Sequence, residues 1–529
     1  MKILKSLFHR HPYWLSFAIG TASAAGFAPL GLWPVSLIAL ACWMALVNGS
    51  TSRKSAFISG WLFGLGHFIV GLNWIAKAFT FQAAMPEWLG YIAVILLAFY
   101  LAVYPALTAW GAWLVGRGRP LLFGLAFAGF WIITEWLRSW VFSGFIWNPL
   151  GVILIDTPFA ASARSIGTYG FSGAFILLAA LCRAVFNRIL MQEWRLVLRR
   201  VFDLAVFSAA AVGLAFIGSG ADRTASGKQP DITIVQPNIG QQDKWQAGYE
   251  ERNLAKLAGL TVRKEDQPRL LFWPEAAIPD YLEAGYPQRY YYGRPADLVR
   301  AQLTSLMKPG DMLILGALKL EFDETMQPQA RRAIGARNSV YAMDSARNLV
   351  GRYDKSHLVP YGEYLPMRPI LSAIGLSRLA PGDFDFWPGP GPRSVDLPGF
   401  GKMGLQICYE IIFSGQVVHR ENRPDFIFNP SNDAWFGAWG PPQHLAQARL
   451  RALEEGLPVI RSTPTGISAV ISSRGAVLHD IPMGQAGRID TQLPRPENPT
   501  IFARYGNILS LGFALFLLIC AIAIRSRAR

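Results

Sequence analysis

Three side chains with complementary chemistry each follow an apolar run that is typical of a buried strand. Glu275 comes directly after an apolar run that ends in Phe-Trp-Pro, Lys355 follows the hairpin-like segment 342–350, and Cys408 interrupts the apolar stretch 404–413. A carboxylate can remove the proton of a thiol, and a fixed ammonium can stabilise the oxyanion of a tetrahedral intermediate. If the fold unites these residues, the sequence predicts acyl transfer on a cysteine nucleophile.

Cys408 is predicted to lie at a sharp turn between a strand and a helix. Such a turn exposes the thiol near a helix N-terminus, which lowers the thiol pKa; the alternative is a buried structural cysteine. The other cysteines, Cys42, Cys182 and Cys520, lie in long apolar segments, so Cys408 has no disulfide partner in the polar part of the chain. An unpaired thiol in an exported domain indicates a reactive residue.

Glu275 and Lys355 also have ordinary explanations, as a solvated acid at a strand edge and a surface lysine. Histidine is the usual alternative base for a cysteine nucleophile, and His357, His419 and His444 are available, although none follows a predicted strand. His357 is the strongest of them because it lies beside Lys355. The sequence shows no His/Cys cluster with the spacing of metal ligands, so we expect no metal site.

The composition predicts that these residues belong to a membrane protein. The 529 residues are 52% hydrophobic and 16% charged, with 18 tryptophans and a mean hydropathy of +0.26. A soluble protein carries about 25% charged residues. The net charge of +15 would suit a nucleic-acid partner, but basic cytoplasmic loops give a membrane protein the same excess.

Eight apolar segments are candidate membrane spans, seven before residue 220 and one near the C-terminus. They cover roughly 12–28, 33–48, 55–76, 88–115, 120–137, 165–187, 201–219 and 508–524. Most have the length of about 17–25 residues that a helix needs to cross a bilayer. The second is the shortest.

Lysine and arginine occur in every second loop, which places those loops and both termini in the cytoplasm. The basic residues are Lys2, Lys5, Arg10, Arg53, Lys54, Arg117, Arg119, Arg188, Arg195, Arg199, Arg200, Arg525, Arg527 and Arg529. The polar segment from about 220 to 507 then lies outside the cytoplasm, which excludes nucleic acid as a partner. Within the spans, Glu135 is either functional, as intramembrane charges usually are, or paired with Arg138 near the interface, and we favour the pairing. The apolar loop 143–151 is either re-entrant or an interfacial turn.

The polar segment reads as an α/β domain because strand-like runs alternate with helical ones. Strands are expected at 231–236, 270–273, 312–318, 339–344, 404–407, 425–429, 458–462 and 467–472, and helices at 249–262, 295–307 and 443–455. We therefore predict a polytopic α-helical membrane domain over 1–220, an α/β extracytoplasmic domain over 221–500, and a final membrane helix with a cytoplasmic tail over 501–529.

Three local sequences resemble the carbon–nitrogen hydrolase (nitrilase) superfamily: Trp-Pro-Glu at 273–275, the segment 355–363 and Cys-Tyr-Glu at 408–410. Joined to eight membrane spans, essentially the whole chain resembles the apolipoprotein N-acyltransferase family of the bacterial inner membrane. The resemblance implies a nitrilase-like α-β-β-α sandwich for the outer domain and no cofactor. It also implies a catalytic domain on the periplasmic side of the membrane.

The resemblance assigns a role to each matching position. Glu275 is the expected general base, Lys355 the oxyanion-stabilising residue and Cys408 the nucleophile. Four further positions match residues that support the site or bind substrate in the family: Trp245, Glu363, Tyr409 and Glu410. Tyr361 stands where the family usually has phenylalanine, which is a mild change.

The reaction implied by the resemblance is a ping-pong acyl transfer. A phospholipid such as phosphatidylethanolamine acylates Cys408, and the α-amine of an N-terminal diacylglyceryl-cysteine then takes the acyl group from the thioester. Water must be kept out. The alternatives are a membrane-tethered amidase or nitrilase acting on a small amide, and a transporter with an inert outer domain, which the few intramembrane charges disfavour.

Aromatic stretches support contact between the outer domain and the membrane. They are the tyrosines at 281, 286, 290, 291 and 292, then Phe384, Phe386 and Trp387, and finally Trp435, Phe436 and Trp439. Packing in the protein core is the alternative explanation for each.

Overall fold

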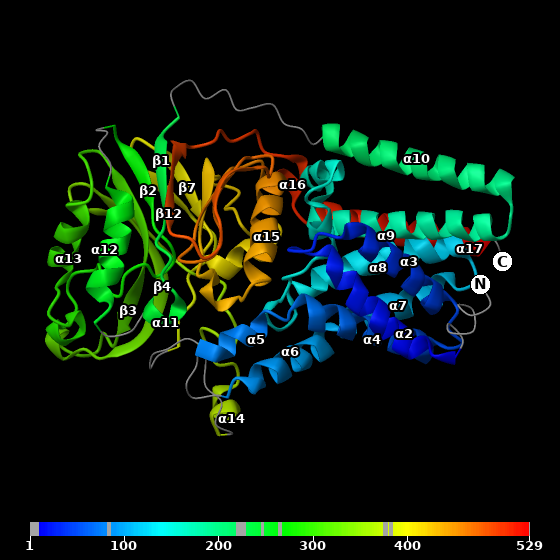
Figure 1. The fold of residues 1–529 in the computed structure, drawn as a ribbon, viewed down its shortest axis with the longest axis horizontal. Coiled ribbons are helices and arrows are strands. Elements are labelled where there is room, and N and C mark those ends of the chain that lie inside the picture. The colour runs from blue at the N-terminus through cyan, green and yellow to red at the C-terminus, as the bar shows by residue number, and fades with distance from the viewer. Residues whose placement is uncertain are drawn as a thin grey trace.

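The computed structural model describes residues 10–81, 86–217, 229–244, 248–262, 267–373, 379 and 385–527. One part of the molecule is helical, and the other contains two β-sheets with helices on their outer sides (Figure 1). The strands in the described residues lie between Asp231 and Gln492, and therefore within the outer domain predicted from composition.

The helices of the first part coincide with the predicted apolar segments. They are α2 (Pro12–Ser23), α3 (Trp33–Asn48), α4 (Arg53–Gly71), α5 (Ile75–Ala78), α6 (Trp88–Leu101), α7 (Val103–Gly116), α8 (Pro120–Arg138), α9 (Ala163–Leu190), α10 (Trp194–Ile217) and α17 (Ile508–Arg527). Helices α2, α3 and α8 carry a proline in their first turn, where its fixed φ suits a helix and no hydrogen bond is lost. The C-terminal helix α17 returns to pack against α8 and α9.

Among the described helices, four are long and apolar enough to cross a membrane: Trp88–Gly116, Pro120–Arg138, Pro158–Leu190 and Ile508–Arg527. A fifth is counted if α4 and α5, which meet at 51°, form one span. Helix α3 is apolar but shorter. The total of eight spans stays a prediction.

The outer domain contains two six-stranded sheets with the same plan. The first has the order β12 (Gly487–Gln492), β1 (Asp231–Gln236), β2 (Arg269–Phe272), β3 (Met312–Phe322), β4 (Ala333–Asp344) and β5 (Leu349–Asp354). The second has the order β11 (Val477–Ile481), β10 (Ser468–Ile471), β9 (Val459–Ser462), β8 (Phe426–Pro430), β7 (Gly401–Leu405) and β6 (Ser394–Leu397). In each sheet three central strands are parallel and the outer strands pair antiparallel.

The sheets pack face to face, and helices cover their outer sides. Ile232 and Phe272 of the first sheet share one buried cluster with Leu405 and Phe428 of the second. Their chain neighbours point the opposite way, since side chains alternate along a strand, and pack under α12 (Glu250–Thr261) and α13 (Ala296–Thr304). Helix α15 (Gly440–Glu455) lies on the second sheet. This arrangement confirms the predicted α-β-β-α sandwich (Figure 1).

All eight predicted strands are present, but four others were missed: β5, β6, β11 and β12. These four are the edge strands of the two sheets. They carry polar and partly exposed positions. A search for apolar runs finds the central strands because both faces of these strands are covered by protein. It misses the edge strands because their side chains are partly exposed to solvent.

A buried polar junction joins the outer domain to the membrane domain. Oε1 of Glu454, near the end of α15, accepts hydrogen bonds from the backbone N–H of Thr168 (2.6 Å), its hydroxyl (2.7 Å) and the hydroxyl of Ser414 (2.7 Å). Arg451 forms an ion pair with Glu454 at 2.9 Å, and neither side chain is exposed to solvent. Helix α15, which packs behind Cys408, is therefore fixed directly to membrane helix α9.

The apolar loop 143–151 lies between the two domains and is mostly buried. Oε1 of Glu135 accepts a hydrogen bond from the backbone N–H of Leu150 at 2.8 Å, and Arg138 donates to the carbonyl of Asn148 at 2.9 Å. The expected direct pairing of Glu135 with Arg138 is therefore wrong: each side chain anchors the loop. The reason is that the loop's backbone groups are buried here and need partners.

Candidate active site

Cys408 begins a single 3₁₀ turn, Cys408–Ile412, shortly after β7. Its φ of +52° lies in the left-handed region, which costs a non-glycine residue roughly 1–2 kcal/mol. Only 5% of the residue is exposed. The sharp turn was predicted correctly, but the exposure of the thiol was not, because residues from the neighbouring strands and loops close over it.

Burial raises the pKa of the Cys408 thiol well above its usual value, and the carboxylate of Glu275 raises it further, whereas the ammonium of Lys355 acts in the opposite direction. The expectation of a lowered thiol pKa is therefore wrong. One 3₁₀ turn supplies little helix dipole, and desolvation of a buried thiolate outweighs it. The thiol therefore needs a base before it can react.

Glu275 lies three residues beyond β2 and is 6% exposed. Its Oε1 accepts a hydrogen bond from the side-chain amide of Asn338 at 2.7 Å, while its buried Oε2 has no hydrogen-bond partner among the described residues. Gly316 permits this placement, because a Cβ there would lie 2.3 Å from the backbone nitrogen of Ala276 and 2.8 Å from Cα of Glu275. The carboxylate therefore keeps one oxygen available to take a proton.

Lys355 directly follows β5, and its ammonium lies between two carboxylates. Nζ is 3.0 Å from Oε1 of Glu363 and 3.7 Å from Oε1 of Glu275, and 2% of the residue is exposed. Burial alone would lower the pKa of Lys355, but Glu363, Glu275 and Cys408 outweigh that effect and raise it. The lysine is therefore a permanent, fixed positive charge beside the thiol.

Asn338 was not predicted from the sequence, although it touches both carboxylates. Its side-chain amide donates to Oε1 of Glu275 at 2.7 Å and to Oε1 of Glu363 at 3.1 Å. Its backbone carbonyl accepts a hydrogen bond from the backbone N–H of Lys355 at 2.8 Å. It lies within β4 in an otherwise unremarkable strand, and no local pattern marks it. The one signal in the sequence is an asparagine directly before the strand predicted at 339–344, where a buried amide would need hydrogen-bond partners.

Glu410 connects the cysteine turn to the lysine loop. Its Oε1 accepts hydrogen bonds from the hydroxyl of Tyr353 (2.8 Å), the backbone N–H (2.7 Å) and hydroxyl (2.7 Å) of Ser356, and the backbone N–H of His357 (3.0 Å). Its Oε2 accepts the backbone N–H of Ile407 at 2.7 Å. Both oxygens are occupied, so this carboxylate holds the site together.

The other predicted supporting residues differ in what the structure shows. Glu363 takes part directly, since its Oε1 meets Lys355 and its Oε2 accepts the backbone N–H of Val359 at 2.9 Å. The hydroxyl of Tyr409 donates to the carbonyl of Gly144 at 3.0 Å and ties the site to the loop 143–151. Trp245 lies outside the described residues.

Comparison with known proteins identifies the family. The model of the apolipoprotein N-acyltransferase N-terminal domain matches residues 19–181, and the carbon-nitrogen hydrolase model matches residues 231–497. Apolipoprotein N-acyltransferases of Rhodopseudomonas palustris and Bradyrhizobium diazoefficiens are each 32% identical to this chain, and one of Allorhizobium ampelinum is 33% identical. These alignments cover 93%, 93% and 89% of this chain and 91%, 91% and 88% of the relatives. The chain belongs to the apolipoprotein N-acyltransferase family.

Membership of the apolipoprotein N-acyltransferase family makes the chain a membrane-associated acyltransferase with a carbon–nitrogen hydrolase domain. It disfavours the amidase and transporter alternatives, because the relatives match both domains together. Aromatic contacts agree with this pairing: Phe436 packs on Trp74 and Trp147 of the membrane domain, and Trp435 packs on Phe81.

The other aromatic stretches have different surroundings. Tyr286 and its neighbours Tyr290 and Tyr291 pack with Leu320 and Ala333 in a small core of the outer domain. Of the stretch around Trp387, Phe386 joins this same core, and Phe384 lies outside the described residues. Core packing therefore explains these tyrosines, whereas Tyr292 is exposed.

The histidines do not form a base for the thiol in the described contacts. The ring of His357 stacks on Phe413 at 3.8 Å, and burial lowers the pKa of His357 to about 4. Nε2 of His444 lies 3.0 Å from the backbone carbonyl of Cys408. His419 is exposed. The alternative of a Cys–His pair therefore has no geometric support here.

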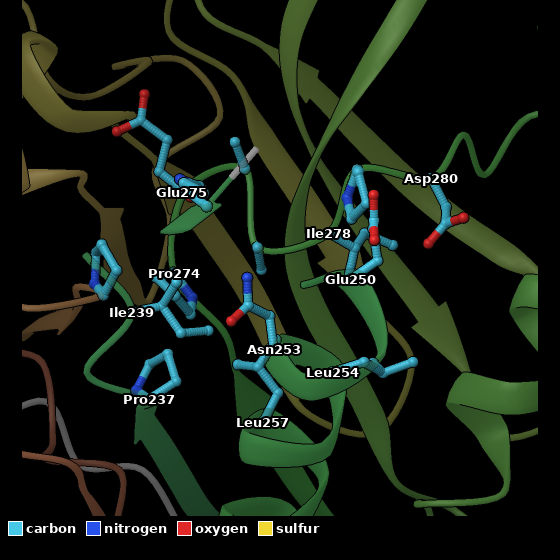
Figure 2. A pocket seen from close by; sticks show the side chains of 15 residues that line it. Pro237, Ile239, Glu250, Asn253, Leu254, Leu257, Pro274, Glu275, Ile278 and Asp280 are labelled. Atoms are coloured by element: carbon cyan, nitrogen blue, oxygen red, sulfur yellow. The ribbon is translucent and has the colours of Figure 1, made fainter. Parts of the chain in front are cut away.

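A small cavity lies behind the Glu275 turn. Figure 2 shows the Glu275 carboxylate pointing away from Asn253 and Leu257, which line this cavity. At about 20 Å³ it has room for roughly one water. Lys244 also lines it; its Nζ donates to the backbone carbonyl of Glu275 at 2.8 Å, and burial lowers the pKa of Lys244 to about 8. Lys244 thus holds the backbone of the turn.

The described residues contain no group of His, Cys, Asp and Glu side chains able to hold a metal ion. Asn338, Lys355 and the three glutamates instead bond to one another and to nearby backbone, which leaves Oε2 of Glu275 as the carboxylate oxygen without a partner among the described residues. The arrangement suits covalent catalysis by a thiol with a carboxylate base and a fixed cation.

Proposed function

We propose that this protein moves a fatty acyl group from a membrane phospholipid to the N-terminal α-amine of a diacylglyceryl apolipoprotein, through a thioester on Cys408. The observation that carries the proposal is the buried placement of the Glu275 carboxylate and the Lys355 ammonium beside the thiol, on a domain fixed to membrane helices. Family membership supports the lipid donor and the lipoprotein acceptor.

In the first half-reaction, the free Oε2 of Glu275 takes the proton of Cys408, and the thiolate attacks the ester carbonyl carbon of the phospholipid. The charge that develops on the carbonyl oxygen is stabilised by the ammonium of Lys355, whose charge Glu363 and Glu275 maintain. The tetrahedral intermediate expels the glycerol oxygen, which receives the proton from Glu275. A lysophospholipid leaves, and a thioester remains.

In the second half-reaction, the α-amine of the apolipoprotein attacks the thioester carbonyl. Glu275 takes a proton from the attacking nitrogen, and the intermediate expels the thiolate of Cys408. The proton returns to sulfur, and the N-acylated lipoprotein leaves. The low exposure of Cys408, Glu275 and Lys355 disfavours competing attack by water.

We further propose phosphatidylethanolamine as the donor and the bacterial inner membrane as the location. The alternating basic loops support an orientation with both termini in the cytoplasm and the catalytic domain on the periplasmic side. The exposed aromatic residues Trp140 and Phe142, beside the junction of the two domains, suit the bilayer interface at that level.

The test uses the purified full-length protein with phosphatidylethanolamine vesicles. The wild type should gain a fatty-acyl mass on the peptide containing Cys408, and hydroxylamine should remove it. Cys408→Ala should gain none, and cells that depend on this variant should accumulate lipoproteins with a free N-terminal amine. Hydrolysis of small amides without any such adduct would instead support an amidase.

A further inference from the structure

The backbone carbonyl of Cys408 has partners of its own, separate from the groups around the thiol. Nε2 of His444 lies 3.0 Å from this oxygen, and the side-chain amide of Asn429 donates to it at 3.4 Å. The same amide donates to the carbonyl of Gln406 at 2.6 Å. Because Cys408 is held at φ +52°, these bonds restrain a turn that the chain does not favour by itself.

A buried arginine fixes both of these partners. Arg461 donates to Oδ1 of Asn429 and, through Nη2, to Oδ2 of Asp433 at 2.6 Å. Nδ1 of His444 lies 3.0 Å from Nη2 of Arg461 and 3.0 Å from Oδ1 of Asp433. The side chains of Arg461, Asp433 and His444 are all fully buried. The four side chains therefore form one connected network behind the nucleophile.

The contacts define the proton on Nε2 of His444. A carbonyl oxygen accepts only, so Nε2 must carry the proton that reaches Cys408. Burial and then the charge of Arg461 lower the pKa of His444 and favour a neutral ring whose Nδ1 accepts from Arg461, whereas Asp433, 3.0 Å from the same nitrogen, acts in the opposite direction. The neutral ring with its proton on Nε2 and the protonated ring both present the Nε2–H that reaches the Cys408 carbonyl, so the geometry alone defines this contact.

The membrane domain contributes to the same network. The ring of Trp147, from the loop 143–151, lies 5.0 Å from the ring of His444, and Phe436 lies 5.7 Å from it. Nε1 of Trp147 donates to Gln443, the neighbour of His444 on α15, at 2.9 Å. The imidazole is therefore packed between the outer domain and a loop that belongs to the membrane helices.

We propose that His444 is a positioning residue for the nucleophile: its Nε2–H holds the Cys408 carbonyl, and thereby the turn that directs the thiol toward Glu275 and Lys355. Arg461 and Trp147 hold the ring in place. The inference rests on the proposed function, because the positioned thiol is the proposed acyl acceptor. Through Trp147, it also makes the geometry of the nucleophile depend on the membrane domain.

The test compares His444→Gln with His444→Leu in the full-length protein. Glutamine places an N–H near the position of Nε2, and leucine places none. With phosphatidylethanolamine vesicles, we expect His444→Leu to slow the maximal rate of Cys408 acylation by about 100-fold, the cost of a small misplacement, at unchanged half-saturating donor. His444→Gln should recover most of the rate. If the leucine variant does not fold, His444→Asn, which is too short to reach the carbonyl, replaces it.

Gln447→Leu is the matched control. Gln447 is one turn further along α15 and equally buried; its amide donates to the backbone carbonyl of Trp147, whereas the indole that contacts His444 is held separately by Gln443. We expect it to acylate at close to the wild-type rate. An equal loss in Gln447→Leu, a wild-type rate in His444→Leu, or a failure of His444→Gln to recover the rate would each overturn the inference.

Hydrogen exchange distinguishes failure of this inference from failure of the proposed function. Backbone amides of the peptide that contains residues 407–412 should exchange faster in His444→Leu or His444→Asn than in the wild type and His444→Gln, whether or not any lipid reacts. Equal exchange in all variants would remove the positioning role. If the wild type never forms a thioester, the proposed function is wrong, but the exchange result still shows whether His444 positions the cysteine turn.

Discussion

Glu275 and Glu410 are both buried carboxylates on turns at Cys408, but their hydrogen bonding is opposite. Oε2 of Glu275 has no partner among the described residues, whereas Glu410 accepts from four donors on one oxygen and from Ile407 on the other. A buried polar atom without a partner is costly. The fold thus tolerates this cost at the position where the proposed mechanism moves a proton and avoids it at the position that fixes the cysteine turn.

The largest expected effect is the loss of acylation when the unsatisfied carboxylate of Glu275 is replaced. Glu275→Gln keeps the shape and can still accept from Asn338, but it cannot take a proton, so thioester formation should fall by about 10²–10⁴-fold. The unfolding temperature should stay near that of the wild type. Acyl-adduct kinetics by mass spectrometry and thermal unfolding of the detergent-solubilised protein check both points. A variant that acylates normally would show that Glu275 is not the base.

Glu410→Gln should affect stability as well as activity. The substitution removes the charge that several hydrogen bonds share and puts an amide NH₂ against a donor, which should destabilise the fold by about 1.5–3 kcal/mol. Acylation should fall as well, since the lysine loop and the cysteine turn lose their link. Thermal unfolding separates the two carboxylates: loss of activity without loss of stability in Glu410→Gln would contradict its structural role.

Gly316→Ala tests whether the backbone at Glu275 must lie close to β3. The added Cβ would meet the backbone of Glu275 and Ala276 at 2.3–2.8 Å, so the turn must shift, and we expect about a 10-fold slower acylation, less than the roughly 100-fold cost of a 1 Å misplacement. Gly259→Ala is the control, because nothing lies within 4 Å of its Cβ on α12. That variant should acylate normally; equal loss in both would refute the steric explanation.

The smallest expected effect is on the pH dependence of stability, through His357, which contacts Glu410. His357 donates its backbone N–H to Glu410, and the pKa of its ring is lowered from 6.5 to about 4. Between these values the unfolded chain binds a proton that the folded chain does not, so stability falls as the pH falls from 6.5 toward 4. His357→Phe, which keeps the stacking on Phe413, should lose less stability over this window. Parallel pH profiles of the unfolding temperature would show that His357 does not contribute.

The sequence was sufficient where the signal is local. Apolar runs located the eight central strands because both faces of those strands are covered. The polar residue types that end such runs marked Glu275, Lys355 and Cys408. Family motifs added Glu363, Tyr409 and Glu410. The two-domain plan followed from the change in composition after residue 220.

The remaining features depend on which segments meet in space. The four edge strands form by pairing with neighbouring strands, and their partly polar sequences do not predict this pairing. Asn338, Asn429 and Arg461 join the site only through contacts across neighbouring strands and loops. Burial of Cys408 reversed the expected direction of its pKa shift because desolvation is set by the surrounding fold. The sequence by itself determined which candidate groups could react and where the composition changes, whereas only the tertiary structure decided which of those groups were left without a hydrogen-bond partner, since hydrogen-bond partners and exclusion of water are non-local.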